Sequence, residues 1–89
     1  MYATLVTVKL DATRSEDIMK NLHDTVVPRS KQAPGFVRGT WFGDGKRGHG
    51  LILFESEEQA QDMASHVSMD PGDPVQIEST AVYKVNAEA

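Results

Sequence analysis

Hydrophobic and polar residues follow patterns that divide the chain into four strands and two helices. Stretches rich in β-branched and aromatic residues, which are typical of strands, cover residues 2–10, 36–42, 49–54 and 75–85. Two further stretches carry apolar residues three and four positions apart, the spacing of one helix face, and cover residues 13–27 and 56–67. The predicted order is therefore strand, helix, strand, strand, helix, strand.

Short polar motifs mark the expected helix ends. Residues 13–16 (Thr-Arg-Ser-Glu) and 56–59 (Ser-Glu-Glu-Gln) both fit a capping box, in which two side chains satisfy the first free backbone N–H groups. Pro28 should break or kink the first helix at the residue before it, with a further short turn to Gln32. The run 70–74 (Asp-Pro-Gly-Asp-Pro) should end the second helix.

This order of elements predicts an α+β fold, the ferredoxin-like βαββαβ arrangement with a four-stranded antiparallel sheet. Right-handed crossovers place both helices on one face of the sheet and leave the other face uncovered. A face exposed to water would alternate apolar and charged residues, but residues 51–54 (Leu-Ile-Leu-Phe) are apolar on both sides. Because a large bare apolar face is normally an interface, we expect a homodimer that packs through the helix-free sheet face.

Composition narrows the function classes. A chain of 89 residues makes a single domain, 1–89, in which we expect residues 86–89 to be a frayed tail. The absence of cysteine excludes disulfides, thiolate metal sites and thiol catalysis. The net charge of −4 argues against nucleic acid and anionic membranes as partners, and against an RNA-binding domain of this topology. Without a visible signal peptide or an apolar stretch long enough to cross a bilayer, we expect a cytoplasmic protein.

Three segments carry a resemblance to a known family. They are the opening strand 2–10, the Pro-Gly-Phe turn at 34–36, and the run 54–60 (Phe-Glu-Ser-Glu-Glu-Gln-Ala) from the third strand into the second helix. Together they resemble the dimeric α+β barrel superfamily, and within it the antibiotic-biosynthesis-monooxygenase-like proteins. The resemblance implies a homodimer with a pocket between sheet and helices, and cofactor-free oxidation of aromatic polyketides or quinols in some members.

Other members of the family bind and degrade haem. Their pattern implies an Asn on the first strand, a Trp on the second helix and a His on or after it. In this chain the Asn would fall at Val6 or Thr7, the Trp at Met63 and the His near Gly72, so none of the three is present. We therefore expect no haem degradation and no bound cofactor.

The run 43–48 matches the pattern G-x-G-x-x-G of dinucleotide-binding loops. That motif needs a helix N-terminus after it to hold the pyrophosphate. Here the sequence continues into a strand, so we expect a flexible hairpin tip and no nucleotide site.

Histidines are the side chains that normally titrate near neutral pH. His23 and His66 lie at the edges of the two helix stripes, so their imidazoles could converge on one pocket, where Asp62 would complete a metal-binding set. Edge positions also suit solvated polar residues, and we favour that interpretation, without a metal site. His49 opens the third strand; it is either a surface residue or a weak catalytic candidate that accepts a proton from a phenolic substrate.

Two rings in the strands, Trp41 and Tyr83, could stack on an aromatic substrate, or fill the core or the dimer seam. We favour the second interpretation. Arg38 lies in the middle of its strand, where a charge needs a partner, and Glu78 on the last strand is the expected one. Binding of a substrate carboxylate is the alternative.

Two functions remain. The first is a cofactor-independent, monooxygenase-like enzyme acting on a small aromatic or hydrophobic substrate, with a pocket that draws on His23, His49, His66, Trp41 and Tyr83. The second is a non-catalytic homodimeric module that binds a small ligand or is associated with stress. A pocket of about 300 Å³ or more, with an imidazole and an aromatic ring converging in it, would favour an enzyme or a binder of small ligands.

Overall fold

The computed structural model describes residues 1–69 and 72–89. Its strands and α-helices follow in the order β1 (Tyr2–Leu10), α1 (Ser15–Asn21), α2 (Val27–Gln32), β2 (Phe36–Gly43), β3 (Arg47–Phe54), α3 (Glu57–His66) and β4 (Val75–Lys84). A 3₁₀ turn at Ala12–Arg14 leads into α1, and a π-helical segment at Leu22–Val26 joins α1 to α2. The predicted order of strands and helices is thus confirmed.

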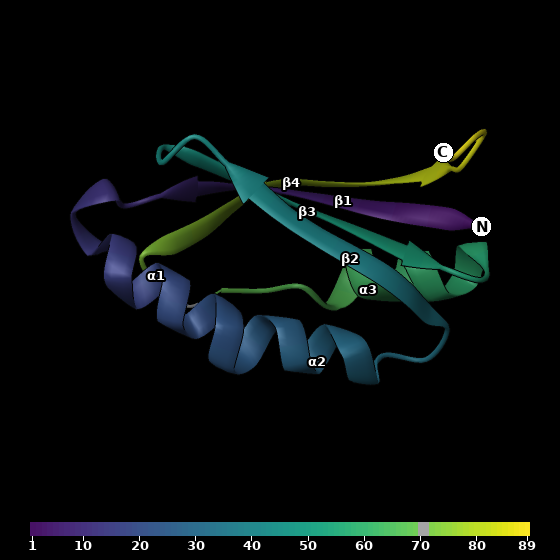
Figure 1. Cartoon of the computed structure of the whole chain (residues 1–89), viewed down its shortest axis with the longest axis horizontal. Helices are drawn as coiled ribbons and strands as arrows, with labels where there is room; N and C mark the ends of the chain where they lie inside the picture. Colours follow the sequence, from purple (N-terminus) through teal and green to yellow (C-terminus); the bar gives the residue numbers. More distant parts are fainter. Residues whose placement is uncertain (70–71) are drawn as a thin grey trace.

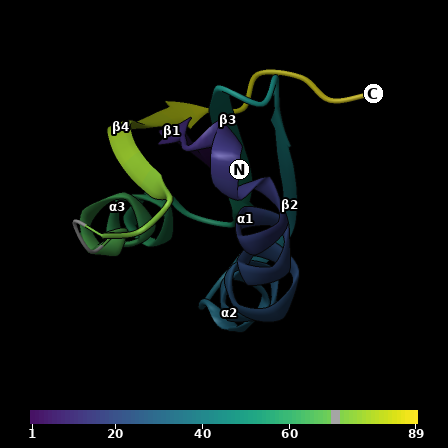
Figure 2. The same ribbon diagram turned by 90° about the vertical axis from the view of Figure 1, so that its left-hand side faces the viewer.

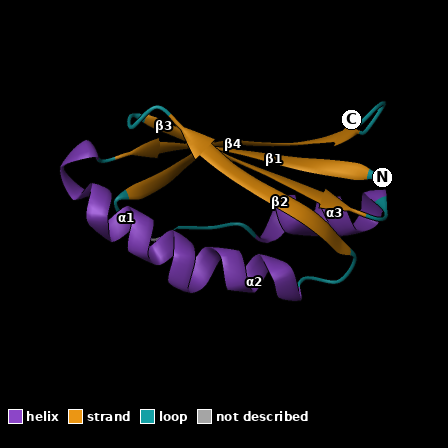
Figure 3. Ribbon diagram, in the orientation of Figure 1, coloured by secondary structure: helices purple, strands orange, loops and turns teal. Residues whose placement is uncertain are grey.

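The four strands form one antiparallel sheet in the order β2-β3-β1-β4. All helices lie on the same face of this sheet, and the opposite face carries none (Figures 1 and 3). Seen from the end, α1 and α2 run under one half of the sheet and α3 under the other (Figure 2). This is the ferredoxin-like α+β fold that the sequence predicts.

A small buried cluster holds α3 against the sheet. Ile52, Phe54 and Ala60 are buried at its centre, with exposed fractions of 3% or less. Thr4 is fully buried on the same face, and its hydroxyl donates a hydrogen bond of 2.8 Å to the carbonyl oxygen of Ala60. A buried hydroxyl needs such a partner, so this bond fixes where α3 crosses β1.

The first helix begins differently from the prediction. Asp11, not Thr13, is the capping residue: its Oδ1 accepts from the backbone N–H of Thr13 at 3.0 Å and from the Thr13 hydroxyl at 2.6 Å. The Thr13 hydroxyl is thereby engaged as a donor, and the backbone makes a 3₁₀ turn before α1 starts at Ser15. The shorter Asp turn therefore replaces the expected Thr13 capping box.

The helix also passes through Pro28 without ending there. Helical geometry continues from Leu22–Val26 into α2, and Pro28 occupies the first turn of that helix. Proline has no N–H to donate to the carbonyl groups of the preceding turn, so the continuous helix loses one backbone hydrogen bond here. The widened π-turn before it provides the change in register that the sequence predicts as a break.

The second helix starts as predicted. Ser56 and Gln59 form a complete capping box, with the Ser56 hydroxyl accepting from the Gln59 N–H and the Gln59 amide oxygen accepting from the Ser56 N–H. The helix ends at His66. Of the run 70–74 expected to terminate it, Asp70 and Pro71 lie outside the described residues.

The expected ion pair between Arg38 and Glu78 is wrong. Arg38 contacts Glu88 in the C-terminal tail at 2.6 Å, while Glu78 accepts from Arg47 on β3 at 3.1 Å. The reason is the strand order, because β3 and β1 separate Arg38 on β2 from Glu78 on β4.

Candidate functional site

A cavity of about 420 Å³ lies between the sheet and the helices. Most of its lining is apolar and comes from both layers. The strands contribute Val6, Val8, Leu10, Ile52 and Val75, and the helical layer contributes Ile18, Leu22, Val26 and Met63. Its size and its predominantly apolar lining are typical of sites for small organic molecules.

Two glycines of β3 leave the sheet without side chains at the floor of the cavity. Successive residues of a strand point to opposite faces, so Gly48 and Gly50 share the helix-facing side with Ile52. Both glycines are buried, and both line the cavity. The register places Trp41 of β2 opposite Gly50 and Gly43 opposite Gly48. This part of the sheet is therefore flat.

The indole of Trp41 lies over Gly39 of its own strand and Gly50 of β3. A Cβ atom added at Gly50 would lie 2.9 Å from Trp41 Nε1, and one added at Gly39 would lie 2.6 Å from the far edge of the indole. Both distances are shorter than the van der Waals contact between a carbon and a nitrogen or between two carbons. The indole can therefore keep this position only if residues 39 and 50 are glycines. Trp41 is half-buried and lines the cavity, which makes it the predicted site residue whose ring faces the helices.

His23 and His66 are exposed, and neither lines the cavity. His23 lies in the π-helical segment, where the wider turn changes which residues share a face. The Nδ1 of His66 is 2.7 Å from the carbonyl oxygen of Asp62, one turn earlier in α3. The structure therefore does not bring these two imidazoles together.

His49 borders the cavity, but its ring is directed to the helix-free face. Its Nδ1 is 3.2 Å from the hydroxyl of Thr7 on β1, and its ring stacks on that of Phe42 with centroids 5.2 Å apart. Tyr83 lies on the same helix-free face and is 56% exposed. Of the three predicted site residues that lie in strands, Trp41 faces the helices, whereas His49 and Tyr83 lie on the helix-free face.

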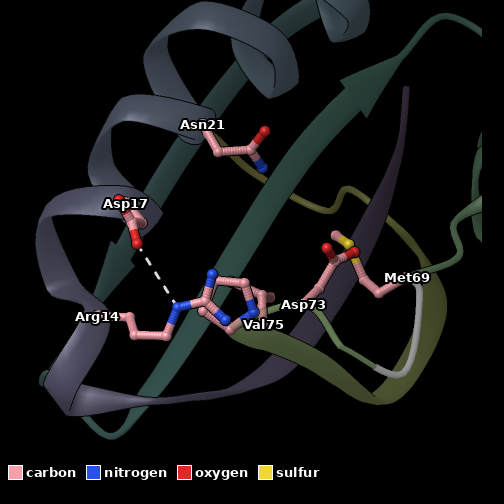
Figure 4. A pocket seen from close by; sticks show the side chains of 7 residues that line it. Arg14, Asp17, Asn21, Met69, Asp73 and Val75 are labelled. Carbon is pink, nitrogen blue, oxygen red and sulfur yellow. Dashed lines mark ion pairs between the residues drawn. The ribbon is translucent and has the colours of Figure 1, made fainter.

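The sequence did not reveal a second, polar hollow that shares Asn21, Met69 and Val75 with the cavity. Beside the cavity lies a second hollow of about 250 Å³ with the charged side chains of Arg14, Asp17 and Asp73 (Figure 4). Arg14 Nε is 3.5 Å from Asp17 Oδ2, and both residues lie near the start of the first helix. No sequence motif marks this set, because Asp73 comes from the segment before β4 and is brought to the others only by the fold.

The charges of the described residues are mostly on the surface. Hydrogen bonds from the hydroxyl and N–H of Thr13 lower the pKa of Asp11, which lines the cavity.

Within residues 1–69 and 72–89, no group of three or more His, Asp or Glu side chains is placed to hold a metal ion. None of the helices in that part of the chain is long and apolar enough to span a membrane.

No protein-family model matches this chain, and none of the curated proteins compared with it matches in sequence. Solved structures do match. The heme-degrader MhuD from Mycobacterium tuberculosis, solved with two hemes in its active site, has a TM-score of 0.73 at 14% identity, over 100% of this chain and 99% of that one. The ActVA-Orf6 monooxygenase of Streptomyces coelicolor, solved with nanaomycin D, has a TM-score of 0.62 at 14% identity, over 99% of this chain and 89% of that one. The chain thus shares the overall fold of these two proteins.

Proposed function

We propose that this protein binds a small, flat, largely apolar aromatic molecule in the cavity between sheet and helices. The observation that carries the proposal is the indole of Trp41, which lies over Gly39 and Gly50 of the sheet and lines the cavity. A planar ligand can stack on an aromatic ring there, while the aliphatic side chains of the helices cover its other face. The volume of about 420 Å³ is within the range of small-molecule sites.

The binding test compares two glycine substitutions by isothermal titration with 2-naphthol. Gly50→Val adds carbon atoms where Trp41 Nε1 already lies, so the indole must leave its place and the affinity should fall about tenfold or more. Gly72→Val is the matched control, because nothing lies within 4 Å of a Cβ at that position. Equal affinities of the two variants, with circular dichroism spectra unchanged, would contradict the proposal.

Oxidation of the bound molecule without a cofactor is the second candidate. It is favoured by the fold shared with a monooxygenase solved with nanaomycin D. In such a reaction a CH₂ group between two aromatic rings reacts with O₂ to give a ketone and water, one oxygen atom going to each product. The substrate must first lose a proton, and the ring of His49 is directed away from the cavity. Binding is therefore the better supported function.

The catalytic candidate is tested with dithranol, which contains such a CH₂ group, in an oxygen electrode. An enzyme should consume one O₂ for each ketone formed, faster than the protein-free reaction, and Trp41→Ala should lose this acceleration. His49→Ala should keep it, because its ring lies on the other face. If the wild-type protein gives only the protein-free rate while it binds 2-naphthol, the function is binding without catalysis.

We also propose that two copies pair through the helix-free sheet face. Large apolar side chains are exposed there, including Phe42 at 52%, Leu51 at 36% and Tyr83 at 56%. Exposed apolar patches of this kind are commonly interfaces, and a domain of this size gains stability from such burial. A twofold axis would place each patch against its own copy.

Leu51→Glu tests this pairing by analytical ultracentrifugation. The substitution puts a charge in the middle of the face and should turn a dimer into a monomer at micromolar concentration. Gln61→Glu on α3 is the control for added charge, since that position is exposed and lies on the helical side of the sheet. A monomeric wild-type protein at high concentration would refute the proposed dimer.

A further inference from the structure

The helical run beside the cavity directs every fourth residue toward it. Ile18, Leu22, Val26 and Ser30 lie four positions apart, and all four line the cavity. A regular α-helix does not keep such a series on one face, because its turn of about 3.6 residues rotates the last of the four by about 120° from the first. The phase of the helix must therefore be corrected between Ile18 and Ser30.

The π-helical segment Leu22–Val26 makes this correction. The N–H of Val27 donates to the carbonyl oxygen of Leu22, five residues earlier, whereas an α-helix bonds to the fourth residue back. The wider turn takes up one surplus residue, which leaves the direction of Ser30 only about 20° from that of Ile18. The helix nevertheless runs on from α1 into α2 (Figure 1).

Pro28 explains why the turn stays wide. In a regular α-helix the N–H of residue 28 would donate to the carbonyl oxygen of Asp24. Proline has no N–H, and its ring collides with the carbonyl group four residues earlier. Because proline is the least favourable residue inside an α-helix, it raises the free energy of the regular helix relative to the π-turn.

On the basis of the proposed binding function, we infer that Pro28 is a positioning residue for the ligand. It is exposed and does not line the cavity itself. It holds the π-turn, and the turn directs Val26 and Ser30 into the same cavity as Ile18 and Leu22. The helical wall that covers the ligand thus depends on a residue that does not touch the ligand.

The test begins with Pro28→Ala, and 2-naphthol is the probe in isothermal titration. The alanine restores the missing N–H and permits a regular α-helix, in which the surplus residue rotates Val26 and Ser30 by about 100° out of line with Ile18 and Leu22. The affinity should fall about fivefold to tenfold, because these side chains then no longer cover the apolar ligand.

Pro34→Ala is the matched control. Pro34 is an exposed proline in the turn before β2, and it does not line the cavity. Its replacement should change the affinity by no more than about twofold.

Deletion of Thr25 removes a residue from the π-turn itself. Thr25 is exposed and lies between Leu22 and Val26. In the wild-type background the deletion forces Pro28 into a regular helix, so both the affinity and the midpoint of thermal unfolding should fall. In the Pro28→Ala background the same deletion should restore the affinity to within about twofold of the wild type, because the four lining residues return to one face of a regular α-helix.

The hydrogen bond of Val27 reports the helical register independently of binding. In the wild type, a scalar coupling across this bond should connect the Val27 nitrogen with the carbonyl carbon of Leu22. In Pro28→Ala the coupling should connect it with the carbonyl carbon of His23, four residues earlier. A merely structural role of Pro28 would change the stability without this change of partner.

Each outcome decides the inference. If the wild type binds 2-naphthol and Pro28→Ala binds it equally well, the positioning role is refuted and the binding function stands. If Pro28→Ala binds weakly or does not fold, the double variant is decisive: an affinity near that of the wild type supports the inference, and one no better than that of either single variant overturns it. If the wild type does not bind 2-naphthol, the proposed function fails and the inference fails with it.

Discussion

Replacing Gly35 by alanine tests how the turn at 34–36 and the start of α3 depend on each other. Gly35 lies in the turn before β2 with φ of +77°, a conformation that residues with a Cβ avoid. Its carbonyl oxygen accepts the N–H of Glu55 at 3.0 Å. A Cβ at this position would overlap the side-chain amide of Gln59, which caps α3. The glycine and the capping box are therefore in direct contact.

Two costs add in the Gly35→Ala variant. The positive φ costs about 1–2 kcal/mol for a residue with a Cβ. The new Cβ also drives the Gln59 amide away from the N–H of Ser56, which removes one half of the capping box and costs about 1 kcal/mol. The free energy of unfolding should thus fall by about 2–3 kcal/mol. For a domain of this size the melting temperature should fall by about 10–20 °C.

The assay is urea unfolding followed by circular dichroism at one fixed protein concentration, since self-association would add to the apparent stability. Gly72→Ala is the control glycine and should stay within about 0.5 kcal/mol of the wild type. The decisive measurement is Gly35→Ala in the Gln59→Ala background, where no amide remains to be displaced. There the substitution should cost only the φ component of about 1–2 kcal/mol. Strict additivity of the two single substitutions would refute the proposed contact.

Two further predictions concern other contacts of the fold. Thr4→Val removes the hydroxyl that donates to the carbonyl oxygen of Ala60 and should lower the free energy of unfolding by about 1 kcal/mol, measured by urea unfolding; an unchanged midpoint would contradict a structural role for this bond. The Asp44 carboxylate accepts the N–H groups of Arg47 and Lys46, which lowers its pKa below the ordinary value of an Asp side chain. Its contribution to stability is therefore present above that ordinary value and is lost as the pH falls through the folded-state pKa. Asp44→Ala should therefore be less stable than the wild type at pH 7, with a difference that shrinks below about pH 4 in thermal unfolding; a difference independent of pH would contradict this.

Most of the fold could be predicted because its signals are local. The stretch of β-branched residues at 2–10 predicted the observed limits of β1, and Ser56 with Gln59 identified the start of α3. The start of the first helix was harder, because Asp11 and Thr13 are both good capping residues two positions apart. Asp11 becomes the capping residue because the Thr13 hydroxyl donates its hydrogen bond to the Asp11 carboxylate. Spacing in the sequence does not specify that outcome.

The site could be predicted only in part, because its residues depend on long-range geometry. Trp41 was among the candidates, yet the feature that positions its ring is the pair of glycines opposite it. Glycines at alternate positions of one strand indicate a bare patch on one face, and Gly48 and Gly50 carried this signal. For His23 the difficulty was different, because the π-turn around it changes the helical face.

The alternation of β3 connects the cavity with the proposed dimer face. Gly48 and Gly50 point to the helices, while His49 and Leu51 point to the opposite side. A slip of one residue would exchange the two sets, placing an imidazole and a leucine in the cavity and glycines on the outer face. The register is held at the hairpin by the Asp44 carboxylate, which binds the backbone of the first β3 residue. Both proposed functions of the sheet therefore rest on one register, and a variant that shifts it should lose ligand binding and self-association together.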